Sequence, residues 1–270
     1  VSHTPNGIFG YNITETATST KPGTINVWST CIFNYTDIYC EGYAEHNESY
    51  NQADGYVLDL SKGGDYDRNW SSIPTQYPEL TGLRTNYIGA LDYLSAQQKS
   101  QLRELYVPNM DLSTLNVSQF PNLEILDCSG NNLTTLNLSS NTKLKTLNCS
   151  ENGLTSLNLS NNTKLETLNC SDNSLTALNL YNNTKLIDVN CSNNNLTALS
   201  DIGRFADLTT LTCYNNNLTS LNLSNNQKLQ QLNCDNNELE GLDLHGNSAL
   251  RYLRCKIKDG YELNLQGCIN

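Results

Sequence analysis

Two adjacent segments of this sequence are nearly the same. Residues 144–164 read LKTLNCSENGLTSLNLSNNTK, and residues 165–185 read LETLNCSDNSLTALNLYNNTK. The two segments agree at 16 of 21 positions. Adjacent copies of so short a unit indicate an array in which each copy forms one turn of a larger structure.

The same unit runs through more than half of the chain. The pattern L-x-x-L-x-(C/L/V) begins at eight leucines: Leu102, Leu123, Leu144, Leu165, Leu186, Leu208, Leu229 and Leu250. The steps are 21 residues, except for 22 between Leu186 and Leu208. A 21-residue turn cannot bury its own leucines, whereas stacked turns share a continuous core. The array therefore predicts a solenoid of about eight turns over residues 102–258.

Each repeat alternates apolar and polar residues twice. Residues 144–149 place Leu, Leu and Cys on one face, and residues 154–159 do the same with three leucines. A period of two is typical of strands. The sequence thus predicts a mainly β fold with parallel strands on both sides of the solenoid.

The string L-x-x-L-x-C-x-x-N-x-L resembles the highly repeated segment of leucine-rich repeat proteins. Its 21-residue length resembles the short, two-strand subclass of that family. The 22-residue turn, which directs Ile202 and Phe205 inward, is similar to the repeats of internalins. This resemblance implies a secreted or cell-surface protein that recognises a protein or a glycan without catalysis.

Two polar columns and one cysteine column recur with the repeat. One Asn column lies where the chain leaves the first strand (Asn131, Asn152, Asn173, Asn194, Asn216, Asn237), and a second lies at the opposite corner (Asn141, Asn162, Asn183, Asn226, Asn247). We expect both to bond backbone groups that bending would leave unpaired. Cysteines 128, 149, 170, 191, 213, 234 and 255 occupy an inward position. A straight row between leucines favours core thiols over disulfides or a metal site.

The flanks of the array differ from it in composition. Residues 1–80 predict a β-rich N-terminal capping region, residues 81–101 a helical lead-in with Ser95 as its N-cap, and residues 259–270 a C-terminal cap. Cys31 and Cys40 are expected to pair in an oxidising compartment. Cys268 either pairs with Cys255 or packs.

Composition and motifs limit the possible functions. The net charge is −11, which disfavours nucleic acid and anionic lipid as partners. The sequence contains no run of about 18 apolar residues, so we expect no membrane insertion. Abundant Asn, 41 residues in all, favours the cell exterior. His3, His46 and His245 lack a neighbouring nucleophile motif, and Asp65 and Asp67 fit a solvated loop. We therefore expect no enzyme activity, metal or cofactor.

The surface positions suggest where function lies. In the middle repeats, the third, fifth and seventh positions carry small polar residues, whereas binding hot spots favour aromatic residues and Arg. The candidate binding residues are Tyr106, Tyr214, Tyr252, Arg254 and Lys256. The candidate glycosylation sites outside the repeats are Asn12, Asn34, Asn47 and Asn69.

Two functions remain open at this point. The first is adhesion or recognition at a cell surface. The second is a structural glycoprotein subunit whose solenoid stacks end to end into an extracellular filament or matrix.

Overall fold

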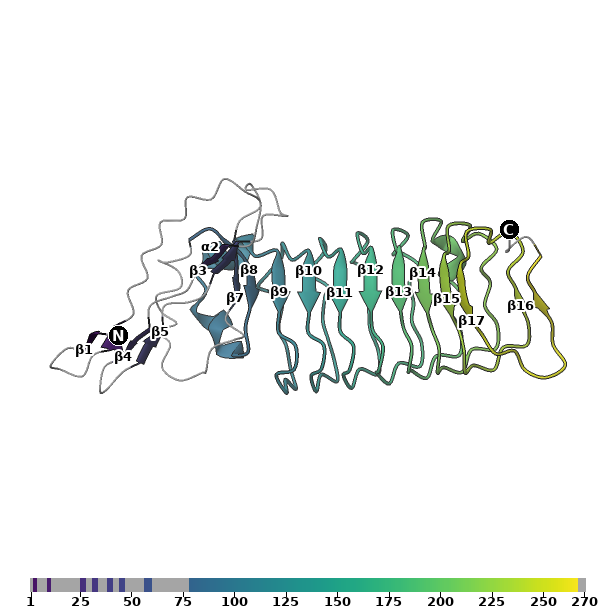
Figure 1. Ribbon diagram of the computed structural model, residues 1–270, viewed down its shortest axis with the longest axis horizontal. Coiled ribbons are helices and arrows are strands. Elements are labelled where there is room, and N and C mark those ends of the chain that lie inside the picture. The colour runs from purple at the N-terminus through teal and green to yellow at the C-terminus, as the bar shows by residue number, and fades with distance from the viewer. Residues whose placement is uncertain are drawn as a thin grey trace. The chain divides into compact units, whose positions relative to one another are not determined.

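The computed structural model describes residues 78–266 in full and, before them, the backbone of seven short strands. The chain forms two compact units, Val1–Met110 and Asp111–Asn270 (Figure 1). The boundaries expected at residues 80, 101 and 258 stay predictions.

Short strands dominate the first unit. They are β1 (Ser2–His3), β2 (Phe9–Gly10), β3 (Ile25–Val27), β4 (Cys31–Phe33), β5 (Ile38–Cys40), β6 (Ala44–His46), β7 (Tyr56–Asp59), β8 (Leu80–Arg84) and β9 (Glu104–Tyr106). Strand β6 pairs antiparallel with β3 and β7, while β8 pairs parallel with β7 and β9. Parallel stacking of turns therefore begins at β7–β8, before the first repeat that the sequence pattern revealed.

Strand β8 adds a turn to the solenoid. Leu80 and Leu83 are fully buried and lie 22 residues before Leu102 and Leu105, their equivalents in the next turn. We call the side formed by the first strand of each turn the first side of the solenoid, and the opposite side the second side. The first unit thus holds two first-side strands, and the second unit holds seven. The protein is a mainly β solenoid of about nine turns, one more than expected, with little helix.

The connection from β8 to β9 contains two helices, η2 (Ile88–Tyr93) and α2 (Ala96–Gln101). Ser95 is the N-cap of α2, as predicted. Its Oγ accepts a hydrogen bond from the Gln98 backbone N–H, and Gln98 Oε1 accepts one from the Ser95 N–H. This reciprocal capping box pairs two N–H groups that the helix start would leave unbonded.

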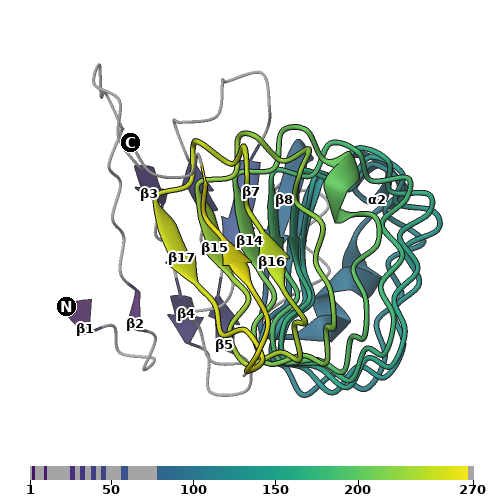
Figure 2. The same ribbon diagram turned by 90° about the vertical axis from the view of Figure 1, so that its right-hand side faces the viewer.

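In the second unit, parallel strands lie side by side in chain order (Figures 1 and 2). The first-side strands are β10 (Ile125–Asp127), β11 (Thr146–Asn148), β12 (Thr167–Asn169), β13 (Asp188–Asn190), β14 (Thr210–Thr212), β15 (Gln231–Asn233) and β17 (Tyr252–Arg254). Each residue pairs with its equivalent one turn later, as Leu147 does with Leu168. This register aligns every repeated position into a column.

The second side is extended but forms few strands. Only β16 (Leu242–Asp243) and β18 (Leu263–Asn264) pair there among the described residues. In other turns a backbone hydrogen bond is followed by a bond to an Asn side chain. For example, Gly153 N–H donates to Leu133 O at 2.9 Å, and the next N–H, that of Leu154, donates to Asn173 Oδ1. The expected parallel strands on both sides are therefore continuous on the first side alone.

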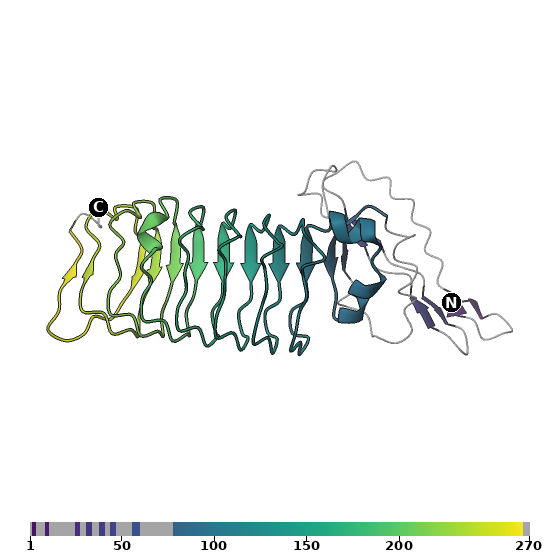
Figure 3. The same ribbon diagram turned by 180° about the vertical axis from the view of Figure 1, so that it is seen from behind.

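The 22-residue turn bulges on the second side, as expected. Its extra residue is accommodated by η3 (Ile202–Arg204), the green coil seen from behind in Figure 3. Ile202 and Phe205 both point into the core, with 1% and 0% of their surfaces exposed.

Candidate functional site

The first Asn column joins neighbouring turns. Asn152 Nδ2 donates to the carbonyl oxygens of Cys128 at 3.0 Å, Cys149 at 3.2 Å and Ser150 at 3.0 Å. Its Oδ1 accepts from the Leu133 N–H at 2.9 Å. The amide nitrogen and the amide oxygen of this side chain both bond backbone groups. The prediction that the first Asn column stabilises the bends of the solenoid is therefore confirmed.

The second Asn column holds the opposite corner. Asn162 is fully buried, and its Nδ2 donates to Leu138 O at 3.2 Å and Asn141 O at 2.9 Å in the previous turn. The Oδ1 atoms of this column find no donor among the described residues. Each of these side chains therefore ties two turns together through its amide nitrogen.

The cysteine column is a row of free thiols in the core. Six of the seven are buried, and Cys255 in the last turn is half-buried. Burial raises the pKa of Cys128 and Cys191 to about 12, because a thiolate would lose its hydration. Thiols with so high a pKa stay protonated and unreactive at neutral pH, as expected for core thiols.

The Cys170→Ser variant should lose about 1–3 kcal/mol of unfolding free energy, because a buried hydroxyl has no assured partner there. The Cys170→Val variant should lose less, since it stays apolar. Urea unfolding of both variants measures the difference. Rapid labelling of folded wild-type thiols by a maleimide would contradict the core assignment.

In the three middle turns the outward face of the first side carries two partly exposed positions. Thr146 and Asn148 are partly exposed, but Ser150 is 5% exposed and Ser171 equally so. At the seventh position Ser150, Ser171 and Ser192 are therefore buried, whereas Ser129, Tyr214 and Asp235 in other turns are partly exposed. Asn148 Oδ1 accepts from Ser150 Oγ at 2.8 Å and its N–H at 3.3 Å, which turns the chain at the strand end.

Three of the candidate binding residues gather on the last first-side strand. Tyr252 is 50% exposed on β17, Arg254 lies two residues further on the same face, and the exposed Lys256 follows. We call Tyr252, Arg254 and Lys256 the β17 edge, because β17 is the outermost strand of its sheet and pairs on one side with β15.

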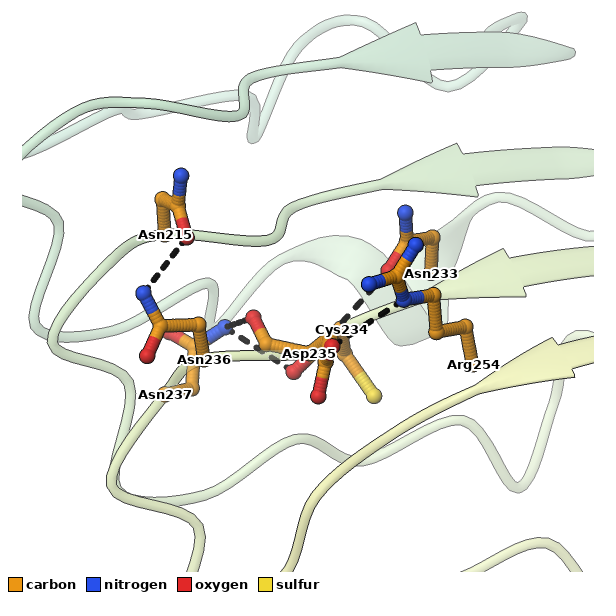
Figure 4. A network of polar contacts seen from close by, with 7 residues as sticks. All are labelled: Asn215, Asn233, Cys234, Asp235, Asn236, Asn237 and Arg254. Carbon is orange, nitrogen blue, oxygen red and sulfur yellow. Dashed lines mark hydrogen bonds and ion pairs between the residues drawn. The ribbon is translucent and has the colours of Figure 1, made fainter.

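A neighbouring strand orients Arg254. Arg254 Nε donates to Asp235 Oδ2 at 3.0 Å, as Figure 4 shows. Beside it, Asn236 Nδ2 donates to Asn215 Oδ1, and Asn237 holds the backbone of Asp235. The ion pair is exposed and adds little stability, but it fixes the guanidinium above the sheet.

Two of the five candidates are not part of the β17 edge. Tyr214 is half-buried, and its hydroxyl lies 3.4 Å from Asn193 Nδ2. Tyr106 lies in the first unit, where its hydroxyl donates to Glu104 and Arg84 stacks 4.4 Å from its ring. The β17 edge alone is a compact group of large, exposed side chains from the original set.

The sequence analysis missed a second exposed aromatic group. Tyr181 is 55% exposed, and the guanidinium of Arg204 lies 4.0 Å from the centre of its ring. Ile187, 39% exposed, lies in the next turn. The sequence signal was Tyr181 at a position where the two preceding turns have Ser139 and Ser160.

Several predictions from the sequence are not tested by the described residues. Strands β4 and β5 place Cys31 opposite Cys40, and their disulfide stays a prediction. Asn12, Asn34, Asn47, Asn69 and Cys268 lie outside the described residues. Within residues 78–266, no cluster of His, Cys, Asp and Glu could hold a metal, and no described helix has the length and hydropathy of a membrane span.

The repeats, the parallel first side and the Asn columns together define a leucine-rich repeat protein. Solved structures show the same class. The chain is 27% identical to the functional domain of InlJ from Listeria monocytogenes, which includes a cysteine ladder; the TM-score is 0.54, with 78% of this chain and 53% of that one covered. No protein-family model matches the chain, and no curated protein matches it significantly.

Two further structures share the fold. A leucine-rich repeat protein of Leptospira interrogans is 22% identical, with a TM-score of 0.57 and 70% and 60% of the two chains covered. An internalin from Listeria monocytogenes, InlF, is 20% identical, with a TM-score of 0.51 and 75% and 82% covered. The chain spans about half the length of the solved InlJ functional domain and three fifths of the solved Leptospira chain.

Proposed function

We propose that this protein is a non-catalytic recognition module that acts outside the cell and binds a protein or glycan of a cell surface through the β17 edge. The observation that carries the proposal is the position of Tyr252, Arg254 and Lys256 on an outermost strand. Tyr and Arg supply most of the energy in typical interfaces, and the turns from β10 to β13 place small polar or acidic groups at most outward positions.

An outermost strand offers more than side chains. Among residues 78–266, strand β17 pairs with β15 alone, so within this part of the chain its other side presents backbone N–H and C=O groups for an added strand. The inward side chains next to it, Leu253 and Cys255, are half-buried and Leu263 is 39% exposed. A partner can therefore gain both hydrogen bonds and apolar burial at this edge.

Similarity to internalin repeat domains supports recognition over catalysis. Leucine-rich repeat domains typically bind proteins, and the Cys and Asn columns of this chain are committed to its core. His245 is the one histidine among residues 78–266, and its Nδ1 lies 3.0 Å from the backbone oxygen of Gln266. The location outside the cell rests on the same similarity and on composition.

Binding of protein-coated fluorescent beads to candidate cells tests this function. Tyr252→Ala and Arg254→Ala should each weaken attachment by about 1–3 kcal/mol of binding free energy, whereas Thr167→Ala should leave it almost unchanged. Circular dichroism establishes that each variant is folded. Equal attachment by wild type and both edge variants would remove the β17 edge from the function.

The exposed apolar groups at β17 and β18 also suit a second copy of the chain, which keeps the filament function as the second candidate. Electron microscopy of the purified protein separates the two. Discrete particles agree with a recognition module, whereas regular filaments that disappear in Tyr252→Ala would identify a structural subunit.

A further inference from the structure

One corner of the solenoid carries a row of lysines. Lys143, Lys164 and Lys185 are exposed and occupy the same position in three successive turns, just before the first-side strand. Identical bonds close these three corners: Leu144 N–H to Asn141 O at 3.2 Å, Leu165 N–H to Asn162 O at 3.1 Å, and Leu186 N–H to Asn183 O at 3.2 Å. The backbone therefore presents the three lysines in the same way.

The spacing of this row is set by the sheet. Immediately after the lysines, Glu166 N–H donates to Lys145 O and Ile187 N–H donates to Glu166 O, both at 2.8 Å. Turns joined in this way repeat at the distance between paired strands, about 4.8 Å. Successive ammonium groups are thus anchored to points about 4.8 Å apart along a straight line.

The three lysines are uncompensated in an otherwise acidic protein. Among residues 78–266 none of them has an ion-pair partner, whereas Lys145 pairs with Glu124 at 2.6 Å. The row ends at the next turn, where Asp207 takes the lysine position and pairs with Lys228 at 2.5 Å.

Charges beyond about 10 Å are screened at 0.1 M salt, so the nearest groups govern a bound ligand. Two carboxylates lie among them: Glu166 follows Lys164 by two residues, and Asp201 Oδ2 accepts from the Leu180 N–H at 3.3 Å, beside Tyr181. They leave the three lysines and Arg204 in excess.

An aromatic group stands beside the row. Tyr181 lies four residues before Lys185 in the same turn, and Arg204 stacks on its ring at 4.0 Å. Arg204 adds a fourth cation near the end of the row, and the exposed part of the Tyr181 ring offers an apolar surface beside these charges.

We infer that this corner binds a linear acidic polysaccharide with one carboxylate on each sugar. In an extended polysaccharide neighbouring sugars are turned against each other, so the carboxylates on one face belong to alternate sugars. Two sugar units are close in length to two turns of the solenoid, about 9.6 Å. Carboxylates on one face therefore pair with Lys143 and Lys185, Lys164 reaches the sugar between them, and one sugar ring packs on Tyr181.

An acidic polypeptide fits the corner less well. Side chains on one face of an extended peptide repeat at about 6.6 Å, which falls out of register with turns about 4.8 Å apart. An acidic helix would need an apolar groove for its other face, but Thr142, Thr163 and Thr184 beside the lysines are exposed and polar. Hydroxyl groups there suit the hydroxyls of a sugar.

The inference is independent of the proposed function at the β17 edge. The lysine row lies at the corners before β11, β12 and β13, and strands β14 and β15 separate it from β17 in the sheet. Variants of the two surfaces can therefore be tested separately in the same protein.

Binding of the full chain to polygalacturonate, measured by calorimetry at low ionic strength, tests the inference. Fully methyl-esterified polygalacturonate is the matched neutral polymer. Substituting all three lysines (Lys143→Gln, Lys164→Gln and Lys185→Gln) should weaken binding about tenfold, because two exposed ion pairs and the contact with the sugar between them are lost. Lys228→Gln is the control, since this lysine already pairs with Asp207, and it should change affinity less than about twofold.

Tyr181→Ser tests the aromatic contact. Ser occupies the equivalent position in the two preceding turns, so the variant should fold, and it should bind polygalacturonate several-fold more weakly. The inference is overturned if wild type does not bind polygalacturonate, binds the methyl ester equally, or keeps its affinity in the triple variant. Tighter binding of poly-L-glutamate would assign the row to acidic proteins and likewise overturn it.

Discussion

Above pH 9 the folded protein should lose stability steeply, by up to about 8 kcal/mol per pH unit, and unfold cooperatively before pH 11. Six buried thiols produce this effect. Each one that ionises on unfolding contributes about 1.4 kcal/mol per pH unit, and a typical domain has only about 5–15 kcal/mol of stability.

The sign follows from the direction of the pKa shifts. Desolvation raises the pKa of Cys128, Cys191 and Cys234 from 9.0 to about 12, and that of Cys149, Cys170 and Cys213 is raised too. Between these values the unfolded chain has released its thiol protons while the folded chain still holds them. The stabilisation is therefore complete below pH 9 and is lost as the pH rises towards 12.

Circular dichroism during alkaline titration measures the transition. The double variant Cys149→Val with Cys170→Val retains every Lys and Tyr, so it controls for their ionisation. Its loss of stability per pH unit should be smaller by about one third, because two of the six thiols are gone. An unchanged slope would show that the cysteine column does not control alkaline unfolding.

Asn173→Ala should cost about 3–6 kcal/mol of unfolding free energy. Asn173 Nδ2 donates to Cys149 O at 3.1 Å, Cys170 O at 3.2 Å and Ser171 O at 3.0 Å, while its Oδ1 accepts from Leu154 N–H at 2.9 Å. The substitution removes four bonds and leaves half-buried backbone groups of two turns without partners, at about 1–3 kcal/mol for each group that water cannot reach.

The matched control is Asn195→Ala, an exposed Asn that directly follows Asn194, the equivalent of Asn173 in the next turn. It should change the free energy of unfolding by less than about 0.5 kcal/mol. Urea denaturation compares the two variants. Equal costs at Asn173 and Asn195 would contradict the role of the first Asn column.

The sequence predicted the features that repeat. A Cys recurs between leucines at the position of Cys170, so its burial follows from the 21-residue period of the sequence. An Asn recurs at the position of Asn152, where the chain bends. The ninth turn was missed because Thr85 stands where later turns have Cys, and helices rather than a second extended segment follow it. Its signal was the pair Leu80 and Leu83, in register with the array.

Contacts that depend on a single turn were beyond prediction. Arg204 reaches Tyr181 because η3 bulges outward, and no periodic pattern fixes where a bulge directs its side chains. Ser150 is buried, whereas Ser129, Tyr214 and Asp235 are partly exposed at the same position of other turns. The alternation of the strand therefore does not fix the exposure of this position, which depends on the neighbouring turns.

Repeated residues build the solenoid, and we propose that non-repeated exposed residues on β17 make the contacts with a partner. Bead attachment by two double variants tests this claim most directly. Tyr252→Ala with Arg254→Ala should lose most of the attachment, while Thr146→Ala with Thr167→Ala, in the repeated face, should retain it. Loss of attachment in the threonine pair, with the β17 pair unaffected, would contradict the claim.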